Sequence, residues 1–293
     1  MGFERCHPAV NLIFFAAVLA GTCCFLHPVF LAISFLCAFL YSLKRNGIRA
    51  LVFNLCLLPL ILVFGLYYSS YHHFGMTVLG QNFIGNQMTL ESLVYGLVLG
   101  TVIAAFLMWM SCLYAVVSSD KIIYLFGRVS PRLSLFLSIL LRMVPRVKTE
   151  ARRIHLARQG IGRGLRQGNP LARVRNAIAI FSMLITWTLD ALATASDSMR
   201  SRGSTLKGRT AFSIYRFDNR DRAYVILIFA CLTVVAMGVL LRQTDILYNP
   251  RILLNPITSM SWLFYGGYLI LCLMPFGLEL WTEFRFRQAR RVL

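Results

Sequence analysis

Two short stretches of the chain pair an arginine with a small or polar neighbour and a nearby glycine. They are Leu156-Ala-Arg-Gln-Gly160 and Met199-Arg-Ser-Arg-Gly203. Each alone is typical of a helix end capped by glycine, where a cation interacts favourably with the helix dipole. Together, the two stretches put one guanidinium group at the end of each of two predicted helices. A guanidinium forms forked hydrogen bonds to a carboxylate. We therefore predict two sites that dock onto acidic grooves of partner proteins: Ala157, Arg158 and Gln159, and Ser201, Arg202 and Gly203.

Other short motifs resemble nucleotide- or metal-binding sites but lack the neighbouring elements or ligands that such sites require. Gly203–Thr210 imitates a phosphate-binding loop, but that loop requires a preceding strand, and here a helical pattern precedes it. Gly160–Gly164 lacks the spacing of a dinucleotide loop, and adjacent His72 and His73 have no acidic or cysteine partner nearby. Since no nucleophile elbow, HExxH pattern or paired intramembrane carboxylates occur, we expect no enzyme activity, cofactor or metal site.

The first arginine belongs to a predicted helix that starts near Pro145. Apolar residues recur there at spacings of four, three, three and four, which predicts one apolar stripe surrounded by basic residues. The stripe consists of Val147, Ala151, Ile154, Ala157 and Ile161. Four glycines between 160 and 168 predict a flexible loop after it.

The second arginine follows a predicted helix over about 171–200. Asn169-Pro170 supplies an N-cap and a first-turn proline. The helix is mostly apolar, with one narrow polar stripe of Asp190, Thr194, Asp197 and Ser201. A helix of this kind is predicted to lie along a membrane or against other helices, with its C-terminal end free to meet a partner.

The rest of the chain has the composition of a membrane protein. Of its 293 residues 58% are hydrophobic and 14% are charged, against roughly 25% charged in soluble domains. Five long runs lack Asp, Glu, Lys and Arg altogether: 6–43, 50–90, 92–119, 223–241 and 252–278. Since a spanning helix needs about 20 apolar residues and excludes central charges, the fold class predicted is an all-α polytopic membrane protein.

These runs predict about six spans. His27-Pro28 divides the first run into two short spans, because proline interrupts helical hydrogen bonding. The others are predicted at about 50–68, 92–117, 223–241 and 256–280. No cleavage pattern follows the first apolar stretch, so it is expected to remain as a span. Residues 1–119, 120–222 and 223–293 are thus expected to form an N-terminal membrane region, a cytoplasmic coupling module of amphipathic helices, and a C-terminal membrane region with a basic tail.

The net charge of +19 is concentrated between the membrane regions. Residues 142–222 hold 17 of the 30 Lys and Arg but only five acids. Positive charge is retained on the cytoplasmic side of membranes, so this segment and both termini are predicted to be cytoplasmic. This distribution argues against a nucleic-acid partner. Seven of eight cysteines lie in apolar runs, where cysteine acts as a small hydrophobic residue, so neither disulfides nor zinc are expected.

Gly96 and Gly100 form a small-xxx-small pattern within the fourth predicted span. Such a pattern allows two membrane helices to approach closely, because glycine has no side chain. We expect these two glycines to mark a helix-packing site.

The sequence resembles the transmembrane T component of energy-coupling factor transporters, a vitamin- and metal-uptake branch of the ABC systems. The resemblance runs through the whole chain, with His7–Val10 before the first span and Leu141–Pro145 before the first coupling helix. It is most specific at Asp197–Gly203 and Lys207–Thr210. The family carries two Ala-Arg-Gly-like motifs, one at the end of each of two coupling helices. This chain departs from them, with Gln159 in place of glycine and Ser201 in place of alanine.

The resemblance implies a non-catalytic scaffold of a micronutrient importer in the cell membrane. Its partners would be two ABC-type ATPase subunits, engaged by Arg158 and Arg202, and a membrane-embedded substrate-binding subunit. An alternative is a stand-alone membrane protein whose basic segment binds anionic lipid, in which each Lys or Arg contributes about 1 kcal/mol. The two hypotheses differ because the alternative depends on charge alone.

Overall fold

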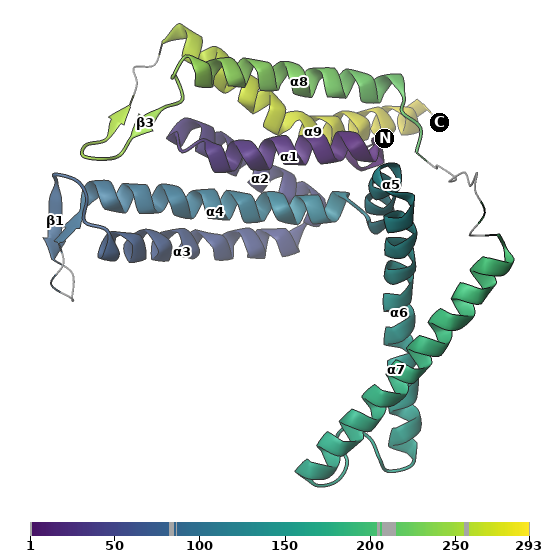
Figure 1. The fold of residues 1–293 in the computed structure, drawn as a ribbon. Coiled ribbons are helices and arrows are strands. Elements are labelled where there is room, and N and C mark those ends of the chain that lie inside the picture. Colours follow the sequence, from purple (N-terminus) through teal and green to yellow (C-terminus); the bar gives the residue numbers. More distant parts are fainter. Residues whose placement is uncertain are drawn as a thin grey trace. The chain divides into compact units, whose positions relative to one another are not determined.

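The computed structural model describes residues 2–81, 85, 87–203, 206, 215–254 and 258–292 (Figure 1). The described chain is almost entirely helical, and its long apolar helices confirm the predicted class of polytopic membrane protein. It divides into two compact units, 1–118 with 215–293, and 119–214. We call the first the transmembrane unit and the second the hairpin unit.

In its described residues the transmembrane unit contains six α-helices and two short β-hairpins. After a 3-10 turn (η1, Phe3–Arg5), its helices are α1 (Pro8–Cys24), α2 (Pro28–Asn46), α3 (Ile48–Tyr71), α4 (Leu90–Val116), α8 (Asn219–Leu240) and α9 (Ser259–Val292). Strands β1 (Val78–Gln81) and β2 (Gln87–Thr89) pair antiparallel between α3 and α4. Strands β3 (Ile246–Leu247) and β4 (Leu253–Leu254) pair in the same way between α8 and α9.

The first apolar run divides at the predicted position. α1 ends at Cys24 and α2 starts at Pro28, which occupies the first helical turn where its missing N–H is harmless. His27 caps α2, because its Nδ1 accepts a hydrogen bond from the Val29 N–H at 3.3 Å. The same arrangement caps α1, with His7 Nδ1 accepting from the Ala9 N–H at 3.2 Å.

The core of this unit is centred on α4, which packs against α1, α2 and α3. Trp109 of α4 is fully buried, and the rings of Phe14 and Phe15 meet it edge-on at centroid distances of 6.0 and 6.4 Å. Its indole N–H donates to the hydroxyl of Ser34 on α2 at 3.0 Å, which satisfies a polar group that would be costly to bury alone.

Gly96 and Gly100 lie where α4 meets α3. A Cβ at Gly96 would stand 2.9 Å from the Gly65 carbonyl oxygen and 2.9 Å from Cβ of Tyr68. A Cβ at Gly100 would stand 3.1 Å from the Ile61 carbonyl oxygen. Both glycines therefore allow a backbone approach that a larger residue would prevent.

The chain leaves and re-enters the transmembrane unit at the same end. Arg45, in the last turn of α2, donates to Glu4 at 2.5 Å and to the Ala115 carbonyl oxygen, near the end of α4, at 3.3 Å. The His7 N–H, just before α1, donates to Asp221 in the first turn of α8 at 3.2 Å. The end of α4 and the start of α8 thus lie beside the N-terminal segment.

The C-terminal helix reaches this end as well. Lys44 of α2 forms an ion pair with Glu283 of α9, with Nζ and Oε2 2.6 Å apart. Figure 1 shows both termini here and the two hairpins at the opposite end of the unit. We call the end that carries the termini the basic end, since Lys44, Arg45, Arg220, Arg285 and Arg287 all belong to it.

Six described helices are long and apolar enough to span a membrane, but they are not the six predicted. They are α2, α3, α4, α8, α9 and α7 (Pro170–Ser201), whereas α1, with 17 residues, is shorter. α7 is the one described helix of the hairpin unit that meets these criteria. A single crossing by α7 would place the end of α4 and the start of α8 on opposite sides of the membrane, and the contacts of Arg45 and His7 place them together.

The hairpin unit differs from the sequence prediction in its first half. The segment contains a helix that was not predicted, α5 (Ser119–Val129), and α6 (Pro131–Gly160) starts at Pro131 instead of near Pro145. Ser130-Pro131 provides the same cap-and-proline start as Asn169-Pro170, and Pro145 lies within α6. α7 has nearly the predicted bounds.

Candidate functional site

The two candidate arginine motifs belong to α6 and α7, which pack against each other and cross within the hairpin unit (Figure 1). A nine-residue loop joins them, and hydrogen bonds hold its conformation. The Gly164 N–H donates to Gln167 Oε1 at 2.8 Å, and Asn176 Nδ2 of α7 donates to the Gly164 carbonyl oxygen at 3.2 Å. The loop that was predicted to be flexible is thus tied to α7.

The first motif ends α6 in a different way from that predicted. Gly160 is the last helical residue, and Gly162, not Gly160, has the left-handed backbone of a C-terminal cap, at φ +75°. The Arg163 N–H donates to the Arg158 carbonyl oxygen at 2.9 Å, which pairs one of the helix's last free acceptors.

Arg158 is half-buried and lies against the loop and α7. Its Nε donates to the Arg163 carbonyl oxygen at 3.5 Å, and its Nη1 lies 3.8 Å from Sδ of Met183. The flanking Ala157 and Gln159 are exposed. Arg158, instead of Ala157, therefore continues the half-buried face of α6, and its guanidinium retains N–H donors beyond those used by these two contacts.

The second motif ends α7 with its arginine exposed. The Ser201 hydroxyl donates to the Ser198 carbonyl oxygen at 2.9 Å, and the Gly203 N–H donates to the Arg200 carbonyl oxygen at 3.0 Å. Gly203 has the left-handed backbone at φ +76°, which favours glycine. Arg202 is exposed, immediately after the last helical residue.

The two guanidinium groups lie far apart. Arg158 contacts Met183, and Arg202 lies 19 residues farther along α7, which corresponds to about 28 Å of helix at 1.5 Å per residue. One carboxylate cannot bind both side chains at this separation. The two arginine motifs therefore remain two separate candidate docking positions.

α7 carries an exposed apolar stripe along most of its length. Its members recur at spacings of three or four and are Leu171, Val174, Ile178, Phe181, Ile185, Leu189 and Leu192. Ile180, on another side of the helix, is buried, and the predicted polar residues Asp190, Thr194 and Asp197 are exposed on a separate strip. A patch of this size indicates a contact with lipid or with another apolar protein surface.

The remaining candidates have structural explanations or lie outside the described residues. The His72 ring stacks on Tyr68 at 4.3 Å, and His73 Nδ1 lies 2.9 Å from the Gln87 carbonyl oxygen. Among the described residues no group of three or more His, Cys, Asp or Glu could hold a metal ion. Ser204 and Lys207–Thr210, which complete the phosphate-loop look-alike and the family-like motif, lie outside the described residues.

No protein-family model matches the sequence, and no curated protein is similar to it at a significant level.

Proposed function

We propose that this protein is the non-catalytic T component of an energy-coupling factor importer. In this role it binds two ABC-type ATPases through Arg158 and Arg202 and couples their ATP hydrolysis to a membrane-embedded subunit that binds a vitamin or metal ion. The observation that carries the proposal is the pair of helix-end arginines of the hairpin unit. Arg158 of α6 contacts Met183 of α7, and about 28 Å of helix separates Met183 from Arg202 at the end of α7.

Three further features support this proposal. The chain enters the hairpin unit after α4 and returns from it before α8, and both of these helix ends lie at the basic end. We therefore expect the partners of the hairpin unit on one side of the membrane. Each arginine can form a charge-assisted fork with a carboxylate of an ATPase. The exposed apolar stripe of α7 offers a surface for the apolar partner, so that movement of the ATPases is passed to that subunit through one continuous helix.

The decisive experiment is co-purification of the affinity-tagged full chain from its native membranes in mild detergent. Arg158→Glu and Arg202→Glu are expected to reduce recovery of the ATPases by at least about tenfold each, because a carboxylate then faces a carboxylate. Arg152→Glu and Arg175→Glu are matched controls, since both arginines are exposed on the same two helices and the charge change is identical. The controls are expected to retain the ATPases.

The lysine series separates the proposal from lipid binding by bulk charge. Arg158→Lys and Arg202→Lys keep the charge but lose the planar fork, so weaker ATPase recovery is expected. Because Arg158 also contacts the loop and Met183, thermal unfolding of each variant is measured alongside. Full ATPase recovery and substrate uptake by folded variants of both arginines would refute the proposal.

A further inference from the structure

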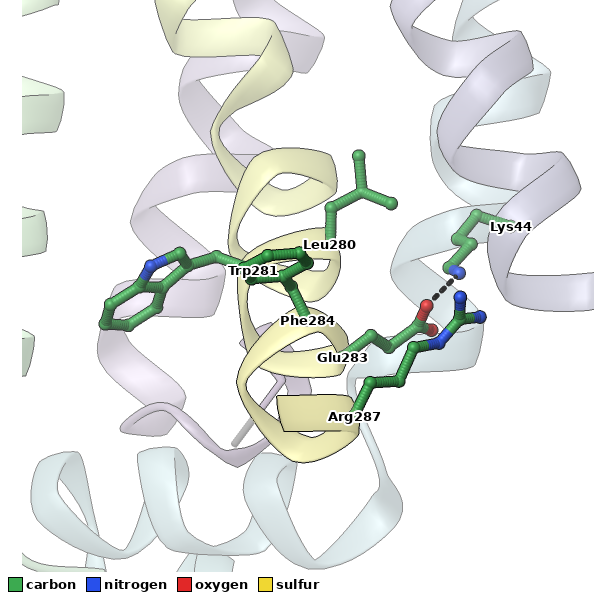
Figure 2. A pocket seen from close by; sticks show the side chains of 6 residues that line it. All are labelled: Lys44, Leu280, Trp281, Glu283, Phe284 and Arg287. Atoms are coloured by element: carbon green, nitrogen blue, oxygen red, sulfur yellow. Dashed lines mark hydrogen bonds and ion pairs between the residues drawn. The ribbon is translucent and has the colours of Figure 1, made fainter. Parts of the chain in front are cut away.

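Among the described residues, three pockets at the basic end of the transmembrane unit are lined in part by α9. One of them, formed around Glu4, Arg5, Arg45, Glu279 and Glu283, contains acids that already pair with its cations. The other two differ from each other in this respect. The first is formed by Lys44, Leu280, Trp281, Glu283, Phe284 and Arg287. In Figure 2 the side chains of Lys44 and Arg287 point toward Glu283, and the indole of Trp281 points to the other side of the helix. The carboxylate of Glu283 lies 2.6 Å from Lys44 Nζ, so the cations of this pocket already have an anionic partner.

The second pocket lies between the start of α8 and the extension of α9, and its described lining contains no acid. It measures about 660 Å³ and is formed by Arg220, Tyr224, Trp281, Thr282, Arg285, Phe286, Gln288 and Ala289. Within the described part of the chain neither arginine forms an ion pair. We call this the α8–α9 pocket.

Its two guanidinium groups are available for an anion. Arg285 lies over the ring of Trp281 at 5.1 Å, and stacking of this kind occupies the face of a guanidinium but leaves its in-plane N–H donors free. Asp221, the acid that follows Arg220, is buried and accepts hydrogen bonds from the N–H groups of His7 and Asp218. That carboxylate is therefore turned inward, away from the ligand position.

The pocket lies just beyond the charge-free runs of α8 and α9, where a spanning helix leaves the hydrocarbon core. The charge-free run of α9 ends at Glu279, and Arg285 is about 9 Å farther along the helix. Arg220 is likewise two residues outside the charge-free part of α8 that follows Arg222. Headgroup layers extend about 5–8 Å beyond each face of the hydrocarbon core, and Trp and Tyr are enriched there. Trp281, about 3 Å beyond Glu279 along the helix, falls within such a layer, and Arg285 falls at its outer edge.

From this combination we infer that the α8–α9 pocket binds the phosphodiester headgroup of one anionic phospholipid. Arg220 and Arg285 would bind the phosphate oxygens, and the side-chain amide of Gln288 would donate to the headgroup. The Thr282 hydroxyl donates to the Glu279 carbonyl oxygen at 2.8 Å, so it could act only as an acceptor there. The exposed rings of Trp281 and Phe286 would contact the glycerol and the first acyl carbons. This site is independent of ATPase docking, so either proposal can fail without the other.

The inference is tested with the purified full chain in a neutral detergent. Short-chain phosphatidylglycerol, phosphatidylcholine and inorganic phosphate are titrated separately, and bound lipid is counted by native mass spectrometry while tryptophan fluorescence is followed. Phosphatidylglycerol is expected to bind at least about tenfold more tightly than phosphatidylcholine, because only the former carries a net negative charge.

Variants identify the site. Arg220→Gln with Arg285→Gln is expected to weaken phosphatidylglycerol binding by about tenfold or more, since two charge-assisted contacts are lost. Arg287→Gln is the matched control, because it removes the same charge two residues away but belongs to the Glu283 pocket (Figure 2). Ala289→Glu adds an acid at the exposed rim without removing any contact, and should weaken binding in the same direction.

Three results would overturn the inference. Equal losses per charge removed in Arg285→Gln and Arg287→Gln would indicate bulk charge instead of a site. If inorganic phosphate binds as tightly as phosphatidylglycerol, the pocket recognises phosphate alone and is not a lipid site. Equal affinity for phosphatidylcholine would exclude recognition of the anion.

Discussion

At the scale of single residues, glycine sets the separation of two membrane helices. Without Cβ atoms at Gly96 and Gly100, the backbone of α4 approaches Gly65 and Ile61 of α3. The small-xxx-small pattern in the sequence indicated a packing position, but the same pattern could serve any neighbouring helix. Only the fold identifies α3 as the partner helix. Gly65 lies 31 residues earlier in the sequence, and α3 is apolar on every side, so no pattern marks the face that packs.

Replacement of Gly96 by alanine is expected to destabilise the protein. The added methyl group would lie 2.9 Å from the Gly65 carbonyl oxygen, and overpacking of this kind costs about 1–3 kcal/mol. Thermal unfolding in detergent measures the effect. Gly266→Ala in α9 is the matched control, since nothing lies within 4 Å of a Cβ there, and its stability should be unchanged or slightly higher. Equal unfolding midpoints for the two variants would contradict this role of Gly96.

Arg158 shows what the residue pattern could not determine. Spacing placed Ala157 on the apolar stripe of α6 and left Arg158 outside it. In the fold His155 and Arg158 continue the half-buried face, and Ala157 is exposed. A long side chain with an apolar stem can lie along a helix interface and keep its charged head at the edge, so its type alone does not predict exposure.

At the scale of elements, the strongest sequence signals came from proline and glycine. Asn169-Pro170 predicted the start of α7 to within one residue, and His27-Pro28 predicted the break between α1 and α2. Pro145 was misleading, because a proline marks either a helix start or an interruption within a helix. The true start of α6, at Ser130-Pro131, follows the unpredicted helix α5 without a glycine-rich boundary.

The apolar stripe of α7 is expected to bind the membrane-embedded partner. Ile178→Glu and Phe181→Glu should each reduce recovery of that partner by about tenfold or more, because an unpaired carboxylate buried in an apolar contact is costly. Thr194→Glu adds the same charge to the exposed polar strip of the same helix and is expected to have little effect. If Thr194→Glu causes the same loss as Ile178→Glu, the stripe is not the contact.

At the scale of the whole molecule, polar contacts at the basic end lead to a prediction of membrane topology. Arg45 connects the N-terminal segment to the end of α4, and His7 connects it to the start of α8. Because the intervening segment leaves and returns at one end of the transmembrane unit, we predict that α7 does not cross the membrane alone, although it is long and apolar enough to do so. The hairpin unit and both termini are therefore predicted to share one side, which positive charge assigns to the cytoplasm.

Single-cysteine labelling of a cysteine-free variant tests this topology. Arg166→Cys in the α6–α7 loop and Arg287→Cys near the C-terminus should react with an impermeant maleimide only after the membrane is permeabilised. Gly80→Cys, in β1 at the opposite end, should react in intact cells, since Gly80 is exposed and nothing lies within 4 Å of a Cβ there. Labelling of residue 166 in intact cells would place the hairpin unit outside and exclude ATPase docking.

The sequence by itself determined that this chain is a helical membrane protein and where most of its apolar helices lie. These properties are local, since a charge-free run of sufficient length and a proline or glycine at its end act over a few residues. The tertiary structure decided which helices meet, how Arg158 is held, and that both connections of the hairpin unit converge. Those features depend on contacts such as His7 with Asp221, 214 residues apart, and in helices that are apolar on every side no periodicity reveals the face that packs.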